Sequence, residues 1–241
     1  MILEKRDIPK FDVNSLPEEF RPLAVKAKEI VKLRSSYRAA VREISTKLEI
    51  LDEEFHVKND YNPIHHMECR IKSLQSMMEK MKRRNIEKTI EGIRSMTDIG
   101  GIRVICNYVD DIYRVADMLL RQDDIELVQR KDYIACPKES GYRSLHLVVT
   151  VPVFLSESTA VLPVEIQIRT IAMDTWASLE HQLKYKNNGN ITKEESEELK
   201  ACALAMAEVD ERMERLHKKI NVSKETEEGA VKGKADEQLE I

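Results

Sequence analysis

Residues 138–149 read KESGYRSLHLVV, and the character of this stretch changes from polar to apolar halfway along. Side chains along a β-strand point alternately to its two faces, so Tyr142, Ser144 and His146 would share one face. The other face would take Arg143, Leu145, Leu147 and Val149, and the preceding loop adds Lys138 and Ser140. An aromatic ring beside an imidazole and these donors has the chemistry to stack on a nucleobase and to bind phosphate.

A second strand-like segment, residues 161–169, carries the sequence VLPVEIQIR. Its larger apolar residues fall on one face, which must be core: Leu162, Val164, Ile166 and Ile168. The opposite face carries Glu165, Gln167 and Arg169. If the two strands are neighbours, the Glu165 carboxylate lies on the same open face as Tyr142 and His146. A nucleotide site would use this combination, but an antiparallel strand with one face in water produces the same alternation, so both interpretations stay open.

Basic residues gather after Pro63, where we expect a helix over about residues 64–90. At about 100° per residue, one arc of this helix is apolar: Ile71, Leu74, Met77, Met78 and Met81. The opposite side carries Lys72, Ser76, Lys80 and Arg83, with Arg70 near the start. A row of basic residues opposite an apolar face is usually the solvated side of a helix. This row, however, contains no acidic residue that could pair with the basic ones. Basic residues without acidic partners are suited to binding a polyphosphate.

The stretch TDIGGIRV, residues 97–104, places Asp98 before two glycines that lead into a strand carrying Arg103. The glycines indicate either a tight turn or a backbone that approaches a ligand closely, with a carboxylate beside it for a divalent ion. No GxxxxGK[ST] phosphate-binding loop occurs in the chain. There is also no HD dipeptide, the commonest sequence sign of a metal-dependent phosphohydrolase.

The elements that must position these residues predict an α/β (α+β) fold with a mixed central sheet and flanking helices. The chain of 241 residues suits one domain, expected over residues 17–220, with an arm at 1–16 and a polar, disordered tail at 221–241. Strands are expected at 100–106, 125–135, 144–153 and 160–169. Helices are expected at about 17–57, 64–90, 110–124, 171–186 and 192–220.

The two terminal helices carry narrow apolar stripes at mostly three- and four-residue spacing. The first stripe comprises Ile30, Leu33, Tyr37, Ile44, Leu48, Leu51 and Phe55. The last comprises Leu199, Cys202, Met206, Val209, Met213, Leu216 and Ile220. Packing on the protein's own sheet and assembly with another subunit explain these stripes equally well.

Net charge, cysteine pattern and the lengths of the apolar runs limit the classes of protein to which this chain can belong. A formal net charge of -4 argues against a general nucleic-acid coat protein, so polyanions must be bound by local clusters of Lys and Arg. The four cysteines form no CxxC and indicate free thiols in a reducing compartment. His65, His66 and Cys69 have metal-ligating side chains, but no second cluster completes a tetrahedral set. With no membrane-length apolar run and no signal peptide, we expect a cytoplasmic protein.

Four segments together resemble the synthetase domain of the alarmone enzymes related to RelA and SpoT. They are RIKSLQSMMEKMKRR, DIGGIRVIC, KDYIACPKESGYRSLHLVV and EIQIRTIAMDTWASLEHQLKYK. They match that family's motifs in order and spacing over about residues 60–187. Because no hydrolase domain or long C-terminal regulatory region is present, the chain resembles the stand-alone small alarmone synthetases, with a nucleotidyltransferase-like fold of about five strands between long terminal helices.

The resemblance implies a GTP/GDP diphosphokinase, which moves the β,γ-pyrophosphate of ATP to the ribose 3′-OH of GDP or GTP. It assigns ATP to Arg70, Lys72, Ser76, Lys80, Arg83 and Arg103. It assigns Mg²⁺ to Asp98 and Glu165, and Glu165 is also the base for the 3′-OH. The resemblance also implies that Tyr142 stacks on the guanine of the acceptor nucleotide. The other residues expected to bind this nucleotide are Lys131, Lys138, Ser140, His146, Gln167 and Asp174.

The resemblance also implies a homotetramer that assembles through its terminal helices. Family members that respond to their product carry a basic patch on the first helix, where this chain has the largely acidic STKLEILDEEF, residues 45–55. We therefore expect weak or absent activation by pppGpp.

Two other classes of function compete with the enzyme. An inactive nucleotide- or RNA-binding regulator on the same scaffold would not need a carboxylate facing the ribose, and RNA or DNA binding is not otherwise indicated. A helical scaffold protein would explain the terminal helices but not the polar motifs between them. The sequence does not rank GDP, GTP and GMP as acceptors.

Overall fold

A five-stranded sheet forms the centre of the computed structural model, which describes residues 26–186 and 191–237. The strands are β1 (Ile64–Ile71), β2 (Gly100–Cys106), β3 (Glu126–Asp132), β4 (Leu145–Phe154) and β5 (Thr159–Thr170). They lie in the order β1-β2-β5-β4-β3, with β2 and β5 parallel and the other neighbours antiparallel. This arrangement confirms the expected mixed α/β (α+β) fold, and β4 and β5 are neighbours as the nucleotide-site interpretation required.

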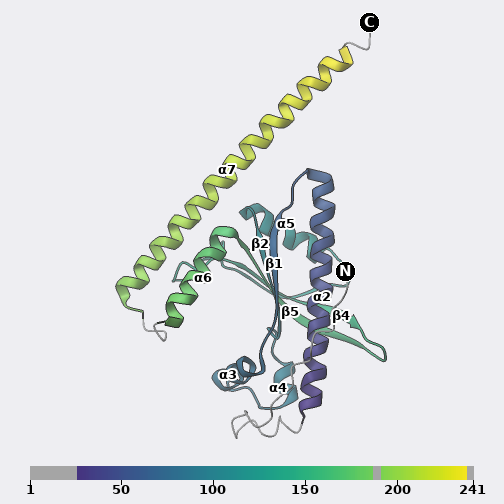
Figure 1. Ribbon diagram of the computed structural model, residues 1–241, viewed down its shortest axis with the longest axis vertical. Helices are drawn as coiled ribbons and strands as arrows, with labels where there is room; N and C mark the ends of the chain where they lie inside the picture. Colours follow the sequence, from purple (N-terminus) through teal and green to yellow (C-terminus); the bar gives the residue numbers. More distant parts are fainter. Residues whose placement is uncertain (1–25, 187–190, 238–241) are drawn as a thin grey trace.

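Helices lie on both sides of this sheet (Figure 1). They are α2 (Ala27–Asn59), α3 (Leu74–Arg84), α4 (Ile90–Arg94), α5 (Val109–Leu120), α6 (Ile171–Lys186) and α7 (Lys193–Glu237). The long α2 runs along one face, while α6 and the first part of α7 lie on the other. The described part of the chain contains no helix that is both long enough and apolar enough to cross a membrane.

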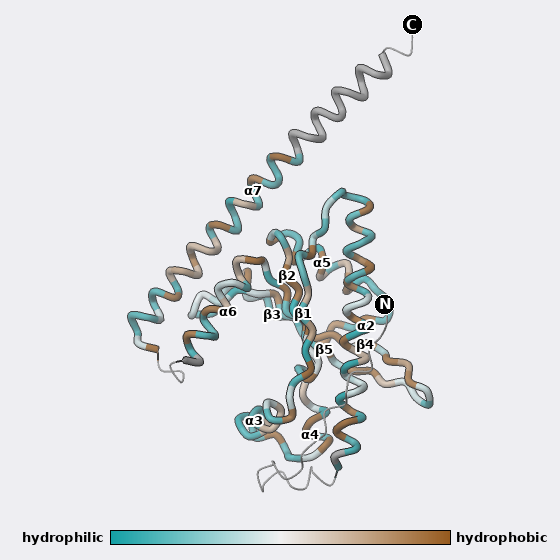
Figure 2. The backbone as a smooth tube through the Cα atoms, in the orientation of Figure 1, coloured by the Kyte–Doolittle hydropathy of each residue, from teal (hydrophilic) through white to brown (hydrophobic). Residues whose placement is uncertain are grey.

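The apolar face of the sheet packs beneath α2, and the alternation within β5 decides which residues it buries. Val164, Ile166 and Ile168 are fully buried there, and the corresponding residues of β4 are buried beside them. Gly100 belongs to this face, because a Cβ at that position would lie 2.8 Å from Val41 Cγ2 of α2. Figure 2 shows hydrophobic segments gathered in the strands of the sheet, with hydrophobic and hydrophilic residues alternating along α2. The opposite, polar face of the sheet is therefore left for chemistry.

One expected element is wrong, since the helix predicted over 64–90 is instead a strand followed by two shorter helices. Residues 64–71 form β1, an edge strand whose side chains are mostly exposed on both faces. Without a buried face, β1 shows no two-residue alternation, and its apolar residues at 64, 67 and 71 have a helix-like spacing. The helix begins only after Ser73, whose Oγ accepts a hydrogen bond from Ser76 N at 3.1 Å.

The terminal helices also differ from their expected bounds. The described part of α2 begins at Ala27 and ends at Asn59, and the expected arm at 1–16 lies outside the described residues. The last helix was expected to end near residue 220, whereas α7 continues to Glu237. The expected disordered tail at 221–241 stays a prediction.

The two apolar stripes have different surroundings. In α2, Ile30, Leu33, Tyr37, Ile44 and Leu48 are buried in the chain's own core. In α7, Val209, Met213, Leu216 and Ile220 are about half exposed, between 48% and 52%. The stripe on α2 is thus satisfied within the chain, whereas much of the stripe on α7 is not.

Candidate active site

The register of the sheet gathers the predicted site residues on its polar face. On β5, Glu165, Gln167 and Arg169 point to this face, and β4 pairs His146 opposite Gln167. On the other side, β2 pairs Gly101 with Glu165 and Arg103 with Gln167. At the two edges, Lys131 of β3 lies opposite His146 and Arg70 of β1 lies opposite Gly101, so all five strands contribute to one surface.

A small hollow of about 100 Å³ lies in the middle of this face. Glu165, Gln167, Arg70, Arg103 and Gly101 line part of it. Glu165 Oε2 accepts a hydrogen bond from Gln167 Nε2 at 3.2 Å and lies 3.9 Å from Arg70 Nη2. Because its neighbours hold it only loosely, the Glu165 carboxylate retains hydrogen-bonding capacity for a ligand.

One end of the face carries the predicted acceptor residues. Tyr142 Oη lies 2.8 Å from His146 Nε2, and the two rings meet edge to face at 5.8 Å. Lys138 Nζ lies 4.6 Å from the ring centroids of both Tyr133 and Tyr142. Trp176 of α6 lies next to Tyr142, with 6.5 Å between ring centroids. The structure thus brings together the aromatic ring, the imidazole and the lysine, as the sequence predicted, while Ser140 is half-buried in the loop beside them.

The loop that carries Tyr142 has a conformation that only glycine adopts readily. Gly141 has φ +88°, in the left-handed region, and its N–H donates to Lys138 O at 2.8 Å. A Cβ at Gly141 would lie 2.5 Å from the Ala203 Cβ of α7. Helix α7 therefore packs directly against the loop that presents Tyr142.

Ser144 does not lie on the open face where strand alternation placed it. Its side chain is fully buried, and its hydroxyl donates to Ile168 O at 3.2 Å. The residue precedes β4, so the regular alternation begins only with Leu145. Ser144 therefore lies below the surface that a ligand would contact.

The other end of the face centres on Asp98. Lys72 Nζ lies 2.6 Å from Asp98 Oδ2, and Lys80 Nζ lies 2.6 Å from Asp98 Oδ1. Burial on its own would raise the pKa of the Asp98 carboxyl, but hydrogen bonding and charge from Lys72 and Lys80 outweigh burial and lower it. The prediction of an uncompensated basic row is therefore wrong for these two lysines, because Asp98 comes from another segment of the chain.

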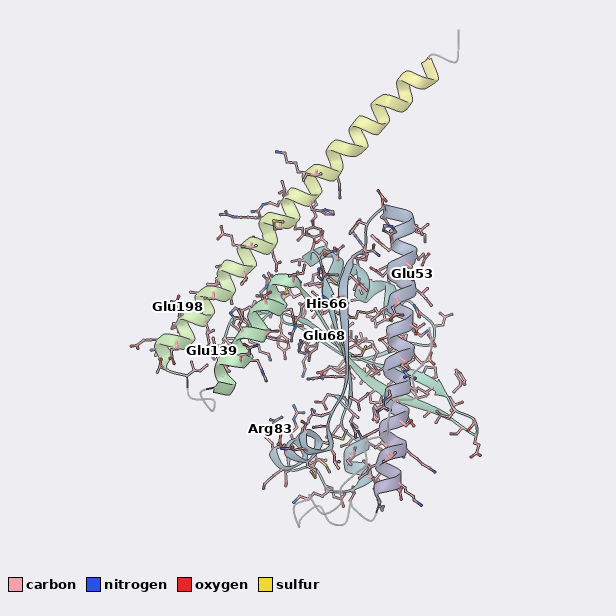
Figure 3. The ribbon with its side chains drawn as sticks, viewed as in Figure 1. Glu53, His66, Glu68, Arg83, Glu139 and Glu198 are labelled. Carbon is pink, nitrogen blue, oxygen red and sulfur yellow. The ribbon has the colours of Figure 1, made fainter. Side chains whose placement is uncertain are left out.

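The remaining basic residues of that row have different environments. Arg70 is 63% exposed on β1, and Arg83 is exposed on α3 (Figure 3). Ser76 is half-buried in the first turn of α3. Arg103 Nη1 lies 3.1 Å from Glu68 Oε2 and 3.5 Å from Asp174 Oδ1, so it joins β1 to the start of α6. In Figure 3, Arg83 and Glu139 mark the two ends of the face, on α3 and in the loop before Tyr142.

Sequence reasoning missed the role of Arg169, which lies almost wholly buried between the predicted acceptor residues. Its guanidinium donates to Tyr142 Oη at 2.5 Å, Gln167 Oε1 at 3.0 Å and Asp174 Oδ1 at 3.1 Å. Strand alternation had placed Arg169 on the correct face with Glu165 and Gln167. Nothing in that pattern distinguishes an arginine that spans a site from one that extends into water.

The histidines and cysteines of the described residues form no cluster of three metal-ligating side chains. Among residues 26–186 and 191–237, no three His, Cys, Asp or Glu side chains converge as a metal site. His65 Nδ1 and His66 Nδ1 lie 2.8 Å apart, but the Cys69 thiol instead contacts Ser45 Oγ of α2 at 2.9 Å. All four cysteines are free, as expected.

The comparisons with known proteins agree with this geometry. A family model described as "Region found in RelA / SpoT proteins" matches residues 69–190. The GTP pyrophosphokinase YwaC of Bacillus subtilis is 40% identical over 186 residues, which cover 77% of this chain and 89% of that protein. The GTP pyrophosphokinase YjbM of the same organism is 40% identical over 184 residues, covering 76% and 86%.

Solved structures show the same relationship. Small alarmone synthetase 2 of Bacillus subtilis superposes with a TM-score of 0.71 at 40% identity, covering 77% of this chain and 97% of its own. Small alarmone synthetase 1, in a structure bound to its product pppGpp, gives 0.73 at 38% identity, covering 80% and 98%. The chain therefore belongs to the RelA/SpoT family, and its fold is that of the small alarmone synthetases.

Proposed function

We propose that this enzyme transfers the β,γ-pyrophosphate of ATP to the ribose 3′-OH of GDP or GTP, making ppGpp and pppGpp. The observation that carries the proposal is the position of Glu165. Its carboxylate lies in the hollow between the cationic groups around Asp98 and Arg70 and the aromatic group around Tyr142. The GTP pyrophosphokinases at 40% identity and the pppGpp-bound neighbour support the same reaction.

ATP would bind at the cationic end of the face, through Arg70, Lys72, Ser76, Lys80, Arg83 and Arg103. Pyrophosphate transfer depends mainly on in-line positioning and on neutralising the charge of the transferring group. Lys72 and Lys80 both pair with Asp98, so a bound triphosphate would compete with that carboxylate for the two ammonium groups.

The carboxylates of Asp98 and Glu165 would hold Mg²⁺. Proteins usually bind this ion through one or two carboxylates, with phosphates and water completing the octahedron, so a cluster of three protein ligands is not needed. Glu165 has free acceptor capacity, whereas both Asp98 oxygens are paired with lysine, so Asp98 fits the metal once the lysines turn to phosphate. The bound ion would supply charge neutralisation at the phosphates.

The acceptor nucleotide would bind at the aromatic end. Tyr142 would stack on guanine, and six neighbours would surround the nucleotide: Lys131, Lys138, Ser140, His146, Gln167 and Asp174. This places the ribose near Glu165, whose carboxylate takes the 3′-OH proton as the hydroxyl attacks. The Gln167 amide donates one hydrogen bond to that carboxylate and leaves its other acceptor positions for ligands.

One assay tests the enzyme and its base together. The protein is incubated with ATP, GDP and Mg²⁺ and the product is separated by anion exchange, beside the Glu165→Gln variant and a sample containing EDTA. We expect ppGpp only from the parent protein with Mg²⁺. An inactive parent would favour the regulator over the enzyme, and full activity in Glu165→Gln would remove its role as base.

Regulation by product is expected to be weak. The segment 45–55 belongs to α2, where Glu53 is exposed and extends from the helix (Figure 3). Acidic residues disfavour a polyphosphate there, so pppGpp added to the assay should leave the rate nearly unchanged. A several-fold stimulation would contradict this expectation.

Assembly into a homotetramer in the cytoplasm completes the proposal. Support comes from α7, where four apolar side chains of the stripe, Val209, Met213, Leu216 and Ile220, stay about half exposed. Contiguous exposed apolar side chains are typical of a surface that meets another subunit.

A further inference from the structure

The Arg169 guanidinium is buried, and its hydrogen bonds go to side chains of the protein. Its side chain is 6% exposed. Besides Tyr142, Gln167 and Asp174, it reaches Ser144, whose buried Oγ accepts from Arg169 Nε at 3.4 Å. All three guanidinium nitrogens are thus engaged. A guanidinium so enclosed is poorly placed to bind a phosphate and well placed to hold its neighbours.

Only an arginine can make this set of contacts. Its planar fork presents donors in fixed directions, whereas a lysine offers a single ammonium group. The Asp174 carboxylate at 3.1 Å compensates the buried charge. Tyr142, Gln167 and Asp174 come from the loop before β4, from β5 and from α6, so Arg169 ties three separate elements together.

The contact with Tyr142 also decides where protons lie in the site. Tyr142 Oη accepts from Arg169 Nη2, so its own proton is free to point to His146 Nε2, 2.8 Å away. In the arrangement where Tyr142 donates to His146, Nε2 is the acceptor and the proton of the neutral ring lies on Nδ1. In agreement, burial and then the charges of Arg169, Lys138 and Lys131 lower the pKa of His146 to about 4.

We propose that Arg169 is the positioning residue of the acceptor-nucleotide site, holding the Tyr142 ring, the Asp174 carboxylate and the Gln167 amide in the one arrangement that receives a guanine nucleotide. This inference rests on the proposed function, because it assumes that these side chains bind GDP or GTP. It assigns Arg169 no contact with the substrate. Tyr142, Gln167 and Asp174 are all assigned to the acceptor nucleotide, and only Asp174 also approaches a residue assigned to ATP, Arg103, at 3.5 Å. Removing Arg169 should therefore weaken binding of the acceptor much more than binding of ATP.

The first test compares Arg169→Met and Arg169→Lys by steady-state kinetics. Losing charge-assisted hydrogen bonds should raise KM for GDP about tenfold or more in Arg169→Met, while KM for ATP changes much less, through the shared Asp174 alone. Arg169→Lys keeps the charge but not the fork, so it should restore little of the loss. Full rescue by lysine, or an equal rise in both KM values, would overturn the proposal.

The second test asks whether Arg169 acts through Tyr142. Tyr142→Phe removes the hydroxyl that receives the guanidinium, so the double variant Tyr142→Phe/Arg169→Met should lose less than the product of the two single effects. The NMR titration of the His146 ring should move to higher pH in Arg169→Met, because one of the charges that lower its pKa is gone. Additive effects, or an unmoved titration, would overturn the proposal.

Thr170→Val is the matched control. Thr170 is the next residue of β5, fully buried, and its hydroxyl donates to Asp210 Oδ2 of α7 at 2.6 Å. This variant should lose stability without a change in KM for GDP specifically. If it shows the same GDP-specific loss as Arg169→Met, the effect is a general loosening of the strand end and the proposal fails.

Direct binding separates this inference from the function itself. Trp176 is the single tryptophan and lies beside Tyr142, so quenching of its fluorescence by GDP reports binding without turnover. A parent protein that binds no GDP would refute the proposed function. A parent that binds GDP while Arg169→Met binds it equally well would refute the role of Arg169 alone.

Discussion

Lys80 and Asp98 form a buried ion pair that joins α3 to the segment before β2. Lys80 Nζ lies 2.6 Å from Asp98 Oδ1, and the lysine side chain is 8% exposed. Lys72 occupies the second carboxylate oxygen. The carboxylate proposed for Mg²⁺ is therefore held by the same lysines that are proposed for phosphate, so nucleotide binding and release of Asp98 are linked.

Lys80→Met tests that link. Removing one partner leaves a buried carboxylate with Lys72 alone, and we expect a loss of about 1–3 kcal/mol in the free energy of unfolding. KM for ATP should rise while KM for GDP stays unchanged, measured with each substrate varied in turn. Arg84→Met, on an exposed position of the same helix, is the control and should change neither quantity. A normal KM for ATP in a folded Lys80→Met protein would show that Lys80 is structural only.

His146 should give the protein a characteristic dependence of stability on pH. Its folded pKa of about 4 lies below the ordinary value of 6.5, so the native state binds fewer protons than the unfolded state between these values. The contribution of His146 is complete above about pH 6.5 and is lost as the pH falls towards 4, amounting to about 3 kcal/mol.

Denaturant unfolding between pH 4 and pH 7 checks this dependence. His146→Gln should flatten the curve in that interval, and His181→Gln, at an exposed position of α6, should not. The groups that face His146 are Tyr142 and Lys138 of the loop, Tyr133 and Lys131 near β3, and Arg169 of β5. An unchanged slope in His146→Gln would mean that other groups carry the acid sensitivity.

Gly141→Ala should disturb the acceptor loop in two separable ways. The left-handed φ costs about 1–2 kcal/mol for a residue with a Cβ, and the added methyl meets Ala203 Cβ at 2.5 Å. Thermal unfolding should show a large loss for Gly141→Ala. The double variant Gly141→Ala/Ala203→Gly should recover the steric part and keep the backbone part. No recovery at all would indicate that Ala203 moves aside freely.

The exposed stripe of α7 should control assembly. Changing Met213 and Leu216 to Lys places charge on a surface that is half exposed within one chain, so folding of the subunit should be little affected. If this surface meets another subunit, light scattering should show a smaller particle than for the parent protein, with the thermal unfolding of the domain retained. Glu208→Lys, on an exposed part of the same helix, is the control. If the parent protein itself proves to be a monomer in light scattering, the proposed homotetramer is wrong.

Much of the site could be predicted wherever a strand has one buried face. Leu162, Val164, Ile166 and Ile168 are all buried, so the alternation in β5 correctly put Glu165, Gln167 and Arg169 on the opposite face. It failed at β1, because an edge strand with little burial on either face has no alternation to detect. It also failed at Ser144, which lies before the regular part of β4.

The sequence by itself determined the family, the order of the motifs and the polar face of the strands with one buried face, because these depend on local spacing and residue type. Only the tertiary structure decided which of those residues meet. Asp98 neutralises Lys72 and Lys80 from another segment, and Arg169 joins Tyr142, Gln167 and Asp174 from three elements. Such contacts depend on the register between strands and on the docking of helices, which no local pattern in the chain encodes.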